Sequence, residues 1–239
     1  MPQLRQLHGV LLKPSIAITV TDREPLEQIR KVIRGARRAV PLLLEIRIDR
    51  FHRLDEDSIL QRTRALKKFG LPLIATVRSR REGGGRNLSD STRLELFKKV
   101  LPSVQMVDVE LSSTRLRKAL IPLAHRKGKK VILSYHNFHR TPSDETLKSL
   151  VRKARQAKAD WVKIAVTARA KSDVTRLFLF TRRHRHQNLI TLAMGRLGRS
   201  SRVLAPRFGS KLTYSFAGRP HAPGQLPLRS LLRELERPL

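Results

Sequence analysis

Apolar runs recur along the whole chain and alternate with segments whose apolar residues are spaced as on one face of a helix. Eight runs are long enough to be strands: Ser15–Val20, Leu42–Asp49, Leu71–Ser79, Met106–Leu111, Lys130–Phe138, Trp161–Thr167, Asn188–Gly195 and Leu212–Ala217. Several are almost continuously hydrophobic, which is typical of parallel strands buried on both faces. The pattern therefore predicts a parallel sheet that is covered on both sides.

Helical spacing follows most of these runs. The predicted helices are Pro25–Ala39, Ser58–Phe69, Ser91–Leu101, Thr114–His125, Ser143–Ala157, Ser172–Arg183 and Leu226–Glu236. The segment Pro142–Glu145 is typical of a helix start, because it places two carboxylates in the first turn. The connection Leu197–Phe208 is short and has room for only a turn or two of helix.

This alternation, in a chain of 239 residues, predicts an α/β fold of the (β/α)8 TIM-barrel type, which typically needs about 250 residues. A doubly wound open sheet is the alternative. No low-complexity linker divides the sequence, so we expect a single domain over residues 1–239. Residues 1–14 lie outside the eightfold pattern and form an N-terminal extension that could cover the bottom of the barrel.

The composition narrows the possible chemistry and location. The chain has no cysteine, which excludes disulfides, a thiolate nucleophile and a cysteine-ligated zinc site. The apolar stretch that ends at Lys13 is too short for a signal sequence. No apolar run approaches the roughly 18 residues needed to span a bilayer. We therefore expect a soluble, cytoplasmic protein that does not insert into membranes.

The charge is strongly basic, with 51 Lys and Arg against 19 Asp and Glu and a formal net charge of +32. Such a surface attracts anions of many kinds, including nucleic acid and carboxylate metabolites. A nucleic-acid site usually combines a contiguous basic stripe with aromatic residues. Here the basic clusters are dispersed and aromatics make up only 5% of the chain. We expect at most non-specific binding of polyanions.

Charged residues interrupt the apolar runs at a few positions, although a buried strand should carry no unpaired charge. Glu45 and Arg47 are two residues apart in one predicted strand and therefore share a face. Further charged or titratable residues lie within or just after other predicted strands: Arg78, His136, Lys163 and Arg202. Barrel enzymes build their active sites at the carboxyl ends of the strands, so we expect these groups to meet there.

Lys163, between Val162 and Ile164, carries the most specific chemical signal. Burial would remove the hydration of its ammonium group. Cations nearby would disfavour the charged form further, and the candidates are Arg47, Arg78 and Arg202. The resulting neutral amine can attack a ketone and form an iminium, which then acts as an electron sink.

His136 is suited to move the proton that such an iminium releases, because an ordinary histidine has a pKa of about 6.5. A carboxylate bonded to the imidazole would orient it, and Glu45 or Glu82 could serve. The arginines would hold a carboxylate substrate by bidentate pairing. The residues therefore predict carbanion chemistry on an anionic ketone and show no spacing typical of a metal site.

Six short motifs, in order and at compatible spacing, resemble the type I 3-dehydroquinate dehydratases from about Ser15 to the C-terminus. They are Glu45–Asp49, Thr76–Ser79 with Glu82–Gly84, Ser134–Phe138 with Thr141-Pro142, Val162–Ala165, Met194–Gly198 with Ser201-Arg202, and Ala222–Gln225. The resemblance implies a barrel that is usually dimeric and uses neither a metal nor a dissociable cofactor. The resemblance implies that the covalent intermediate is instead a Schiff base on Lys163.

The resemblance also implies roles for individual residues. His136 would be the general acid and base, and Glu82 would position it. The other implied contacts are with substrate, through Glu45, Arg47, Arg78, Met194, Arg202 and Gln225. Among these, Met194 would pack against the ring, Arg202 would pair with the carboxylate, and Gln225 would lie on a closing loop.

The implied reaction is the syn elimination of water from 3-dehydroquinate, a step of the shikimate pathway. Lys163 condenses with the C3 ketone, and His136 removes a C2 proton. The enamine expels the C1 hydroxyl, and hydrolysis releases 3-dehydroshikimate. Two other functions stay open: a different Schiff-base lyase or aldolase that acts on an anionic ketone, and an inactive basic barrel that binds nucleic acid.

Two residues depart from the family pattern. Asn137 stands where an aspartate usually follows the active histidine. His221 stands four residues before Gln225, where the closing loop usually carries a serine. Because His221 is bulkier and titratable, we expect it to contact substrate in the closed loop and to affect loop closure, product release or pH dependence.

Overall fold

The computed structural model describes residues 15–36 and 40–236, which form one ring of parallel strands. The strands are β1 (Ser15–Val20), β2 (Leu42–Arg47), β3 (Leu73–Thr76), β4 (Met106–Glu110), β5 (Lys130–Asn137), β6 (Trp161–Thr167), β7 (Leu189–Met194), β8 (Leu212–Phe216) and β9 (Leu226–Pro227). They pair in the order β7-β6-β5-β4-β3-β2-β1-β8-β9. Between β7 and β8, the backbone N–H of Lys211 donates to the carbonyl of Leu189 at 2.8 Å. The predicted (β/α)8 architecture is confirmed.

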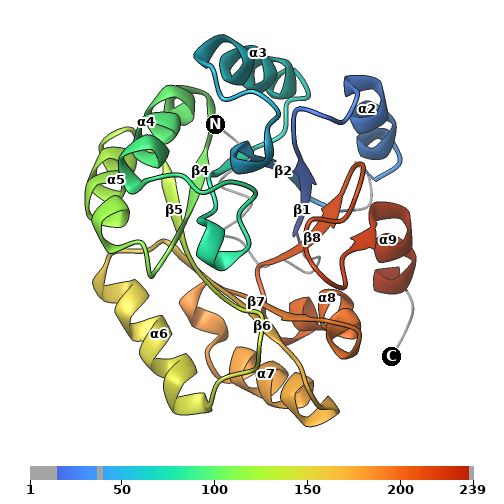
Figure 1. The fold of residues 1–239 in the computed structure, drawn as a ribbon. Coiled ribbons are helices and arrows are strands. Elements are labelled where there is room, and N and C mark those ends of the chain that lie inside the picture. The colour runs from blue at the N-terminus through green and yellow to red at the C-terminus, as the bar shows by residue number, and fades with distance from the viewer. Residues whose placement is uncertain (1–14, 37–39, 237–239) are drawn as a thin grey trace.

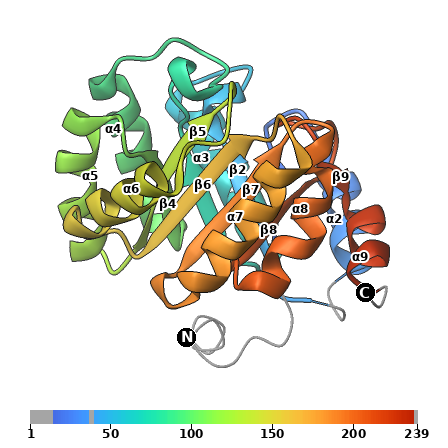
Figure 2. The same cartoon turned by 90° about the horizontal axis from the view of Figure 1, so that it is seen from below.

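Helices cover the outside of this ring, as Figure 1 shows along the barrel and Figure 2 from the side. They are α2 (Leu26–Arg34), α3 (Glu56–Lys67), α4 (Asp90–Val100), α5 (Thr114–Arg126), α6 (Asp144–Gln156), α7 (Lys171–Arg183), α8 (Ser201–Leu204) and α9 (Leu228–Glu236). Three begin at a residue whose side chain accepts a backbone N–H three residues later: Asp55, Ser89 and Ser143. Each such cap typically contributes about 1 kcal/mol.

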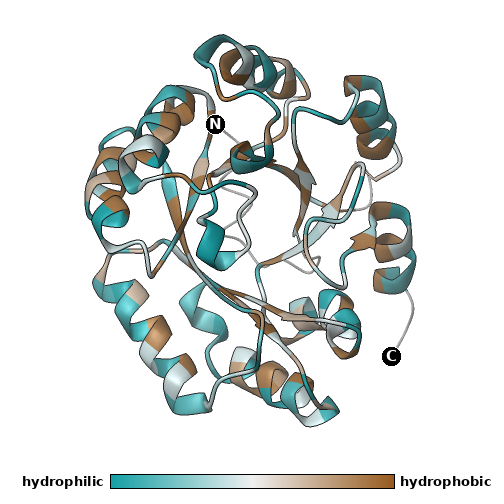
Figure 3. Cartoon of the chain, viewed as in Figure 1, coloured by the Kyte–Doolittle hydropathy of each residue, from teal (hydrophilic) through white to brown (hydrophobic). Residues whose placement is uncertain are grey.

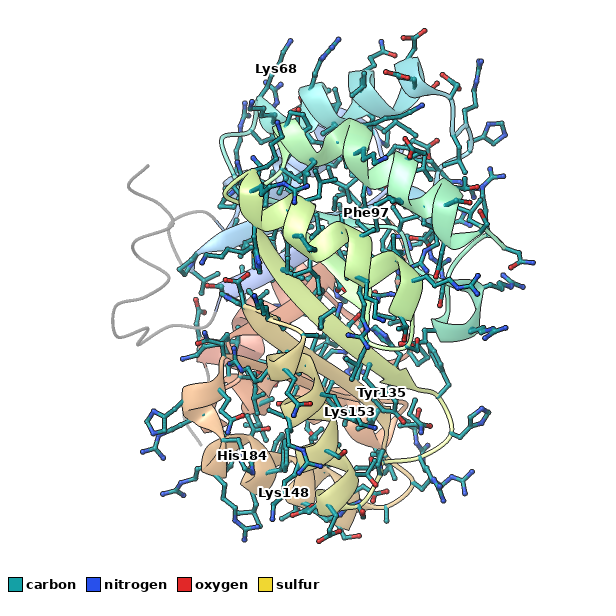
Figure 4. All side chains as sticks on the ribbon, turned by 90° about the vertical axis from the view of Figure 1, so that its left-hand side faces the viewer. Lys68, Phe97, Tyr135, Lys148, Lys153 and His184 are labelled. Atoms are coloured by element: carbon teal, nitrogen blue, oxygen red, sulfur yellow. The ribbon has the colours of Figure 1, made fainter. Side chains whose placement is uncertain are left out.

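The helices are amphipathic, with apolar stripes turned towards the strands and polar stripes turned outwards (Figure 3). Phe97 of α4 is fully buried, whereas Lys148 and Lys153 of α6 are exposed (Figure 4). The lysines and arginines of α6 therefore contribute to the solvated surface, as expected for much of the net charge.

Alternation along each strand separates an outer core from the barrel interior. In β6, Val162 and Ile164 pack outwards under the helices, whereas Trp161 and Ala165 belong to the interior cluster. Lys163 is two residues from each of them. Because alternate side chains of a strand point to the same face, Lys163 also points into the interior. Apolar side chains at the amino ends of the strands fill the interior and leave polar groups towards the carboxyl ends.

The strand ends differ from the prediction near Asp49. We expected strands over Leu42–Asp49 and Leu71–Ser79, but β2 ends at Arg47 and β3 spans only Leu73–Thr76. The carboxylate of Asp49 accepts the backbone N–H of Arg78. The chain after β3 therefore hydrogen-bonds to a side chain and no longer to the backbone of a neighbouring strand. Of these two strand ends, the one after β3 contributes Arg78 to the cavity described below.

Two further expectations were wrong, the start of the last helix and the helical content of the connection after β7. Leu226 and Pro227 form a short strand beside β8 before α9 begins, because Ser215 Oγ donates to the Leu226 carbonyl in addition to the ladder. The Leu197–Phe208 connection contains three successive short helical segments, more than the expected turn or two. The N-terminal extension and the predicted end of the first helix, residues 37–39, lie outside the described residues. None of the described helices is both long and apolar enough to span a bilayer.

Candidate active site

A cavity opens at the carboxyl end of the barrel. The structure brings every predicted site residue to its lining: Glu45, Arg47, Arg78, Glu82, His136, Lys163, Met194, Arg202, His221 and Gln225. These side chains come from β2, β5, β6, β7, α8 and the loops after β3 and β8. These groups are distant in sequence but meet here, because the carboxyl ends of all strands of a barrel lie at the same face.

Lys163 is 5% exposed and ends among carboxylates. Its Nζ lies 3.0 Å from Asp108 Oδ2 and 3.6 Å from Glu45 Oε1. From the sequence we expected only cations around this lysine, and that expectation was wrong. Two buried acids therefore lie at ion-pair distance from the amine of Lys163.

Glu45 and Asp108 are held by further hydrogen bonds. Thr19 and Thr76 donate to the Glu45 carboxylate at 2.8 and 3.1 Å, and Ser134 donates to Asp108 at 2.6 Å. Burial would raise the pKa of Asp108, but Arg78 and Lys163 lower it far below its ordinary value. Both carboxylates are therefore ionised acceptors beside Lys163, and that of Glu45 also lines the cavity.

His136 is positioned by Glu82 and not by Glu45. One carboxylate oxygen of Glu82 lies 3.0 Å from His136 Nδ1 and accepts the backbone N–H of His136 at 2.9 Å. Ser112 also donates to Glu82. This pairing favours the tautomer with hydrogen on Nδ1 and leaves Nε2 as an acceptor. Burial, Arg78 and Lys163 lower the pKa of His136 well below 6.5, so its imidazole is neutral near pH 7.

Arg78 is fixed by acids on β4. It pairs with Asp108 at 2.9 Å and with Glu110 at 3.2 Å. Burial would lower the pKa of Arg78, but these two carboxylates raise it. Glu110 also pairs with the fully buried Arg93, which donates to the Val77 carbonyl at 2.9 Å. This buried network determines where Arg78 presents its guanidinium.

Arg47 is held by a bidentate pair with Asp49, at 2.9 and 2.8 Å. Asp49 also accepts the backbone N–H of Gly85 at 2.9 Å, so the turn after β2 and the loop after β3 are joined. Burial lowers and Asp49 raises the pKa of Arg47, which on balance lies above its ordinary value. Arg47 therefore stays cationic at the cavity wall.

Arg202 is the one buried cation of the cavity whose charge has no acidic partner among the described residues. It is 1% exposed, its Nη2 donates to the Pro223 carbonyl at 2.9 Å, and its Nε has no hydrogen-bond partner within residues 15–36 and 40–236. Burial lowers the pKa of Arg202 to about 10. A buried, unpaired guanidinium is unfavourable, so this geometry suits an anionic ligand.

The loop after β8 folds over the cavity and is bonded internally. Gln225 Oε1 accepts the backbone N–H of His221 at 2.6 Å and of Ala222 at 3.2 Å. His221 Nε2 lies 3.8 Å from Glu24 in the β1–α2 turn. Burial would raise the pKa of Glu24, but contacts from His221 and Thr21 lower it to about 2. His221 thus faces both the cavity and a neighbouring loop.

Asn137 serves the backbone of the loop that follows it. Its amide donates to the Tyr135 hydroxyl at 3.0 Å and accepts the backbone N–H groups of His139 and Arg140. Asn137 does not line the cavity. This departure from the family pattern therefore shapes a turn beside His136 instead of contacting a ligand.

Two residues of the cavity region were missed by the sequence analysis, Asp108 and Tyr214. Asp108 and Glu110 lie two apart in the apolar run Met106–Leu111, so the argument that singled out Glu45 and Arg47 should also have found them. Tyr214 gave no such signal, because a tyrosine in an apolar strand is usually part of the core.

The chain is similar to known proteins over most of its length. The family model described as type I 3-dehydroquinase matches residues 16–236. A protein of Thermodesulfovibrio yellowstonii named 3-dehydroquinate dehydratase is 34% identical over 219 residues, covering 92% of this chain and 93% of the relative. A Hydrogenobaculum protein of the same name is 35% identical over 218 residues, covering 91% and 95%.

Solved structures give the same result. The chain is similar to the crystal structure of 3-dehydroquinate dehydratase from Geobacillus kaustophilus, with a TM-score of 0.84 and 30% identity over 94% of this chain and 90% of that one. A deoxyribose phosphate aldolase from Aeropyrum pernix has a TM-score of 0.56 at 20% identity, covering 89% of this chain and 92% of that one, and shares the fold alone.

Proposed function

Because the chain belongs to the type I 3-dehydroquinase family, we propose that Lys163, His136 and Glu82 carry out its reaction. That reaction is the dehydration of 3-dehydroquinate to 3-dehydroshikimate, a carbon–oxygen lyase step of the shikimate pathway that proceeds through a lysine Schiff base. The observation that carries the assignment of residues is the position of Lys163, a buried amine that lines the same cavity as the neutral imidazole of His136.

Lys163 attacks the C3 carbonyl carbon of the substrate. It must first give up a proton, and the imidazole of His136, neutral because of its low pKa, can accept it. The carbinolamine then loses the former ketone oxygen as water, for which His136 returns a proton. The product is an iminium between Lys163 and C3, which draws electrons from the neighbouring C–H bond.

His136 then removes a proton from C2 and leaves an enamine. Because Glu82 contacts Nδ1, the Nε2 atom is the acceptor. The enamine electrons expel the C1 hydroxyl, which leaves as water with the proton from His136, and a C1–C2 double bond forms. Water hydrolyses the iminium, releasing 3-dehydroshikimate and restoring Lys163.

The remaining residues of the lining bind substrate in this proposal. Glu45, Arg47 and Arg78 contact its hydroxyl and polar groups, and Met194 packs against the ring. His221 and Gln225 contact it from the loop after β8. Rigid support from Thr19, Asp49, Asp108 and Glu110 favours these roles, since a site works best when its groups are already in place.

Arg202 binds the substrate carboxylate. Arg202→Met keeps much of the side-chain length and removes the charge, and we expect kcat/KM to fall about 100-fold, mainly through KM. Because the guanidinium has no acidic partner in the described structure, thermal stability should be unchanged or slightly higher. The exposed Arg199 on the preceding turn provides the control, since Arg199→Met should leave kinetics unchanged. Equal KM values for the parent and Arg202→Met would remove Arg202 from this role.

Borohydride trapping tests the assignment of the nucleophile. The protein is incubated with 3-dehydroquinate and borohydride, which reduces an iminium to a stable amine, and the adduct is mapped by mass spectrometry. We expect one adduct, on Lys163, and none on exposed lysines such as Lys148 or Lys153. Product formation with an adduct at another lysine would overturn the assignment, and the absence of both adduct and product would overturn the function.

Several broader features belong to the same proposal. We infer that the reaction needs no metal or dissociable cofactor, because Lys163 itself provides the electron sink. We propose a homodimer, as the family resemblance implies. We also propose that each chain forms one domain over residues 1–239 and that the protein is cytoplasmic. We propose that the net charge of +32 attracts nucleic acid only non-specifically.

A further inference from the structure

Tyr214 lies directly beside the proposed nucleophile. It belongs to β8, is 2% exposed and lines the same cavity as Lys163 and Arg202. The Lys163 Nζ atom lies 4.1 Å from the centre of the Tyr214 ring, over its face. A cation in this position is attracted by the ring, and more strongly so when both are removed from water.

The hydroxyl of Tyr214 has no hydrogen-bond partner among the described residues, although it is buried. A buried hydroxyl without a partner is unfavourable and rare in folded proteins. Burial, together with Glu45 and Asp108, raises the pKa of Tyr214 well above 10. The group therefore keeps its proton and can donate a hydrogen bond. A phenylalanine would supply the same ring without this unsatisfied donor.

The chemistry at Lys163 needs such a donor. When an amine adds to a ketone, negative charge develops on the ketone oxygen, and a hydrogen-bond donor stabilises it. The two carboxylates nearest to Lys163 Nζ, those of Asp108 and Glu45, cannot donate because they are ionised. Burial would raise the pKa of Glu45, but Lys163 and Arg47 lower it. Tyr214 is a neutral donor at the same place.

We propose that the Tyr214 hydroxyl donates a hydrogen bond to the ketone oxygen of the substrate while Lys163 attacks the carbon that bears it. The phenol oxygen lies at the rim of the ring whose face Nζ overlies. The attacked carbon must bond to Nζ, and the proposal places the ketone oxygen of that carbon against this rim. Tyr214 keeps its own proton, and the ring then contacts the iminium cation. The inference rests on the proposed role of Lys163.

Tyr214→Phe separates this role from a structural one. Without substrate, the variant should be as stable as the parent or slightly more stable, because it loses only an unpartnered hydroxyl. With 3-dehydroquinate, kcat/KM and the rate at which a borohydride-trapped adduct appears should each fall about tenfold, the loss expected for one hydrogen bond. Tyr214→Leu, which also removes the ring, should form the adduct more slowly still.

Tyr135, the other tyrosine of the chain, provides a matched control. Its hydroxyl has a partner in Asn137 and it does not line the cavity. Tyr135→Phe should therefore lower thermal stability slightly and leave the rate of adduct formation unchanged. This is the reverse of the pattern expected for Tyr214→Phe.

Each outcome decides between the two proposals. An unchanged adduct rate in Tyr214→Phe would overturn the role of the hydroxyl and leave the role of Lys163 intact. A variant that is both less stable and less active would show that the hydroxyl is structural, which also overturns the inference. If the parent itself forms neither adduct nor product, the proposed function fails and this inference fails with it.

Discussion

Lys163→Met should lower kcat by about 10⁴-fold or more, because methionine has similar length but no amine with which to form an iminium. Substrate should still bind, since Arg202 and the polar groups of β2 are untouched. We would measure turnover together with substrate binding by calorimetry. Loss of turnover with retained binding is the expected pattern.

The fold should survive this exchange. Removing one partner of a buried ion pair can cost about 3–5 kcal/mol when the other charge is left alone. Here Asp108 keeps Arg78 at 2.9 Å and Ser134 at 2.6 Å, and Glu45 keeps both of its threonines. We therefore expect a smaller loss of stability, measurable by thermal unfolding.

Lys171, the exposed first residue of α7, provides the control for this variant. Lys171→Met should have the kinetics of the parent. Substantial turnover by Lys163→Met would contradict the Schiff-base assignment, because no other lysine is placed in the lining of the cavity by the described structure.

The burial of Lys163 could be predicted from the pattern of the strand that contains it. Its neighbours Val162 and Ile164 mark a buried strand, and the period of two places the amine towards the barrel interior. The site as a set could also be predicted, since barrel strands deliver their carboxyl ends to one mouth. The resemblance to the family then indicated Glu82, and not Glu45, as the partner of His136.

The charge balance around Lys163 could not be predicted in the same way. The sequence shows that Arg78 and Asp108 are charged, but the pair between them depends on the positions of β3 and β4 and of the loop that follows β3. Which cation lacks a partner depends on the same contacts, so the unpaired state of Arg202 was visible only in the structure. The strand ends near Asp49 were missed for the related reason that a side chain replaces ladder bonds there.

His136→Ala should lower kcat about 10³-fold, within the 10²–10⁴-fold range typical of general acid–base groups. Lys163 remains in place, so a borohydride-trapped adduct should still form on it, although more slowly. A trapped adduct with little product would separate iminium formation from elimination. His186, an exposed histidine, provides the control, and His186→Ala should behave like the parent. Loss of the adduct together with activity, in a folded variant, would instead show that His136 is needed mainly to deprotonate Lys163.

The pH dependence of the parent should carry the signature of the same imidazole. His136 accepts a proton only when neutral, so activity is present above its pKa in the folded protein and is lost as the pH falls through that value. Burial, Arg78 and Lys163 hold this pKa well below 6.5. The acid limb of kcat/KM should therefore lie well below pH 6.5, whereas an exposed histidine would place it near that value. In Arg78→Met one of these cations is gone, so the limb should move towards higher pH. An acid limb of kcat/KM near pH 6.5 in the parent would mean that the ionisation belongs to another group. An acid limb that does not move in Arg78→Met would mean the same.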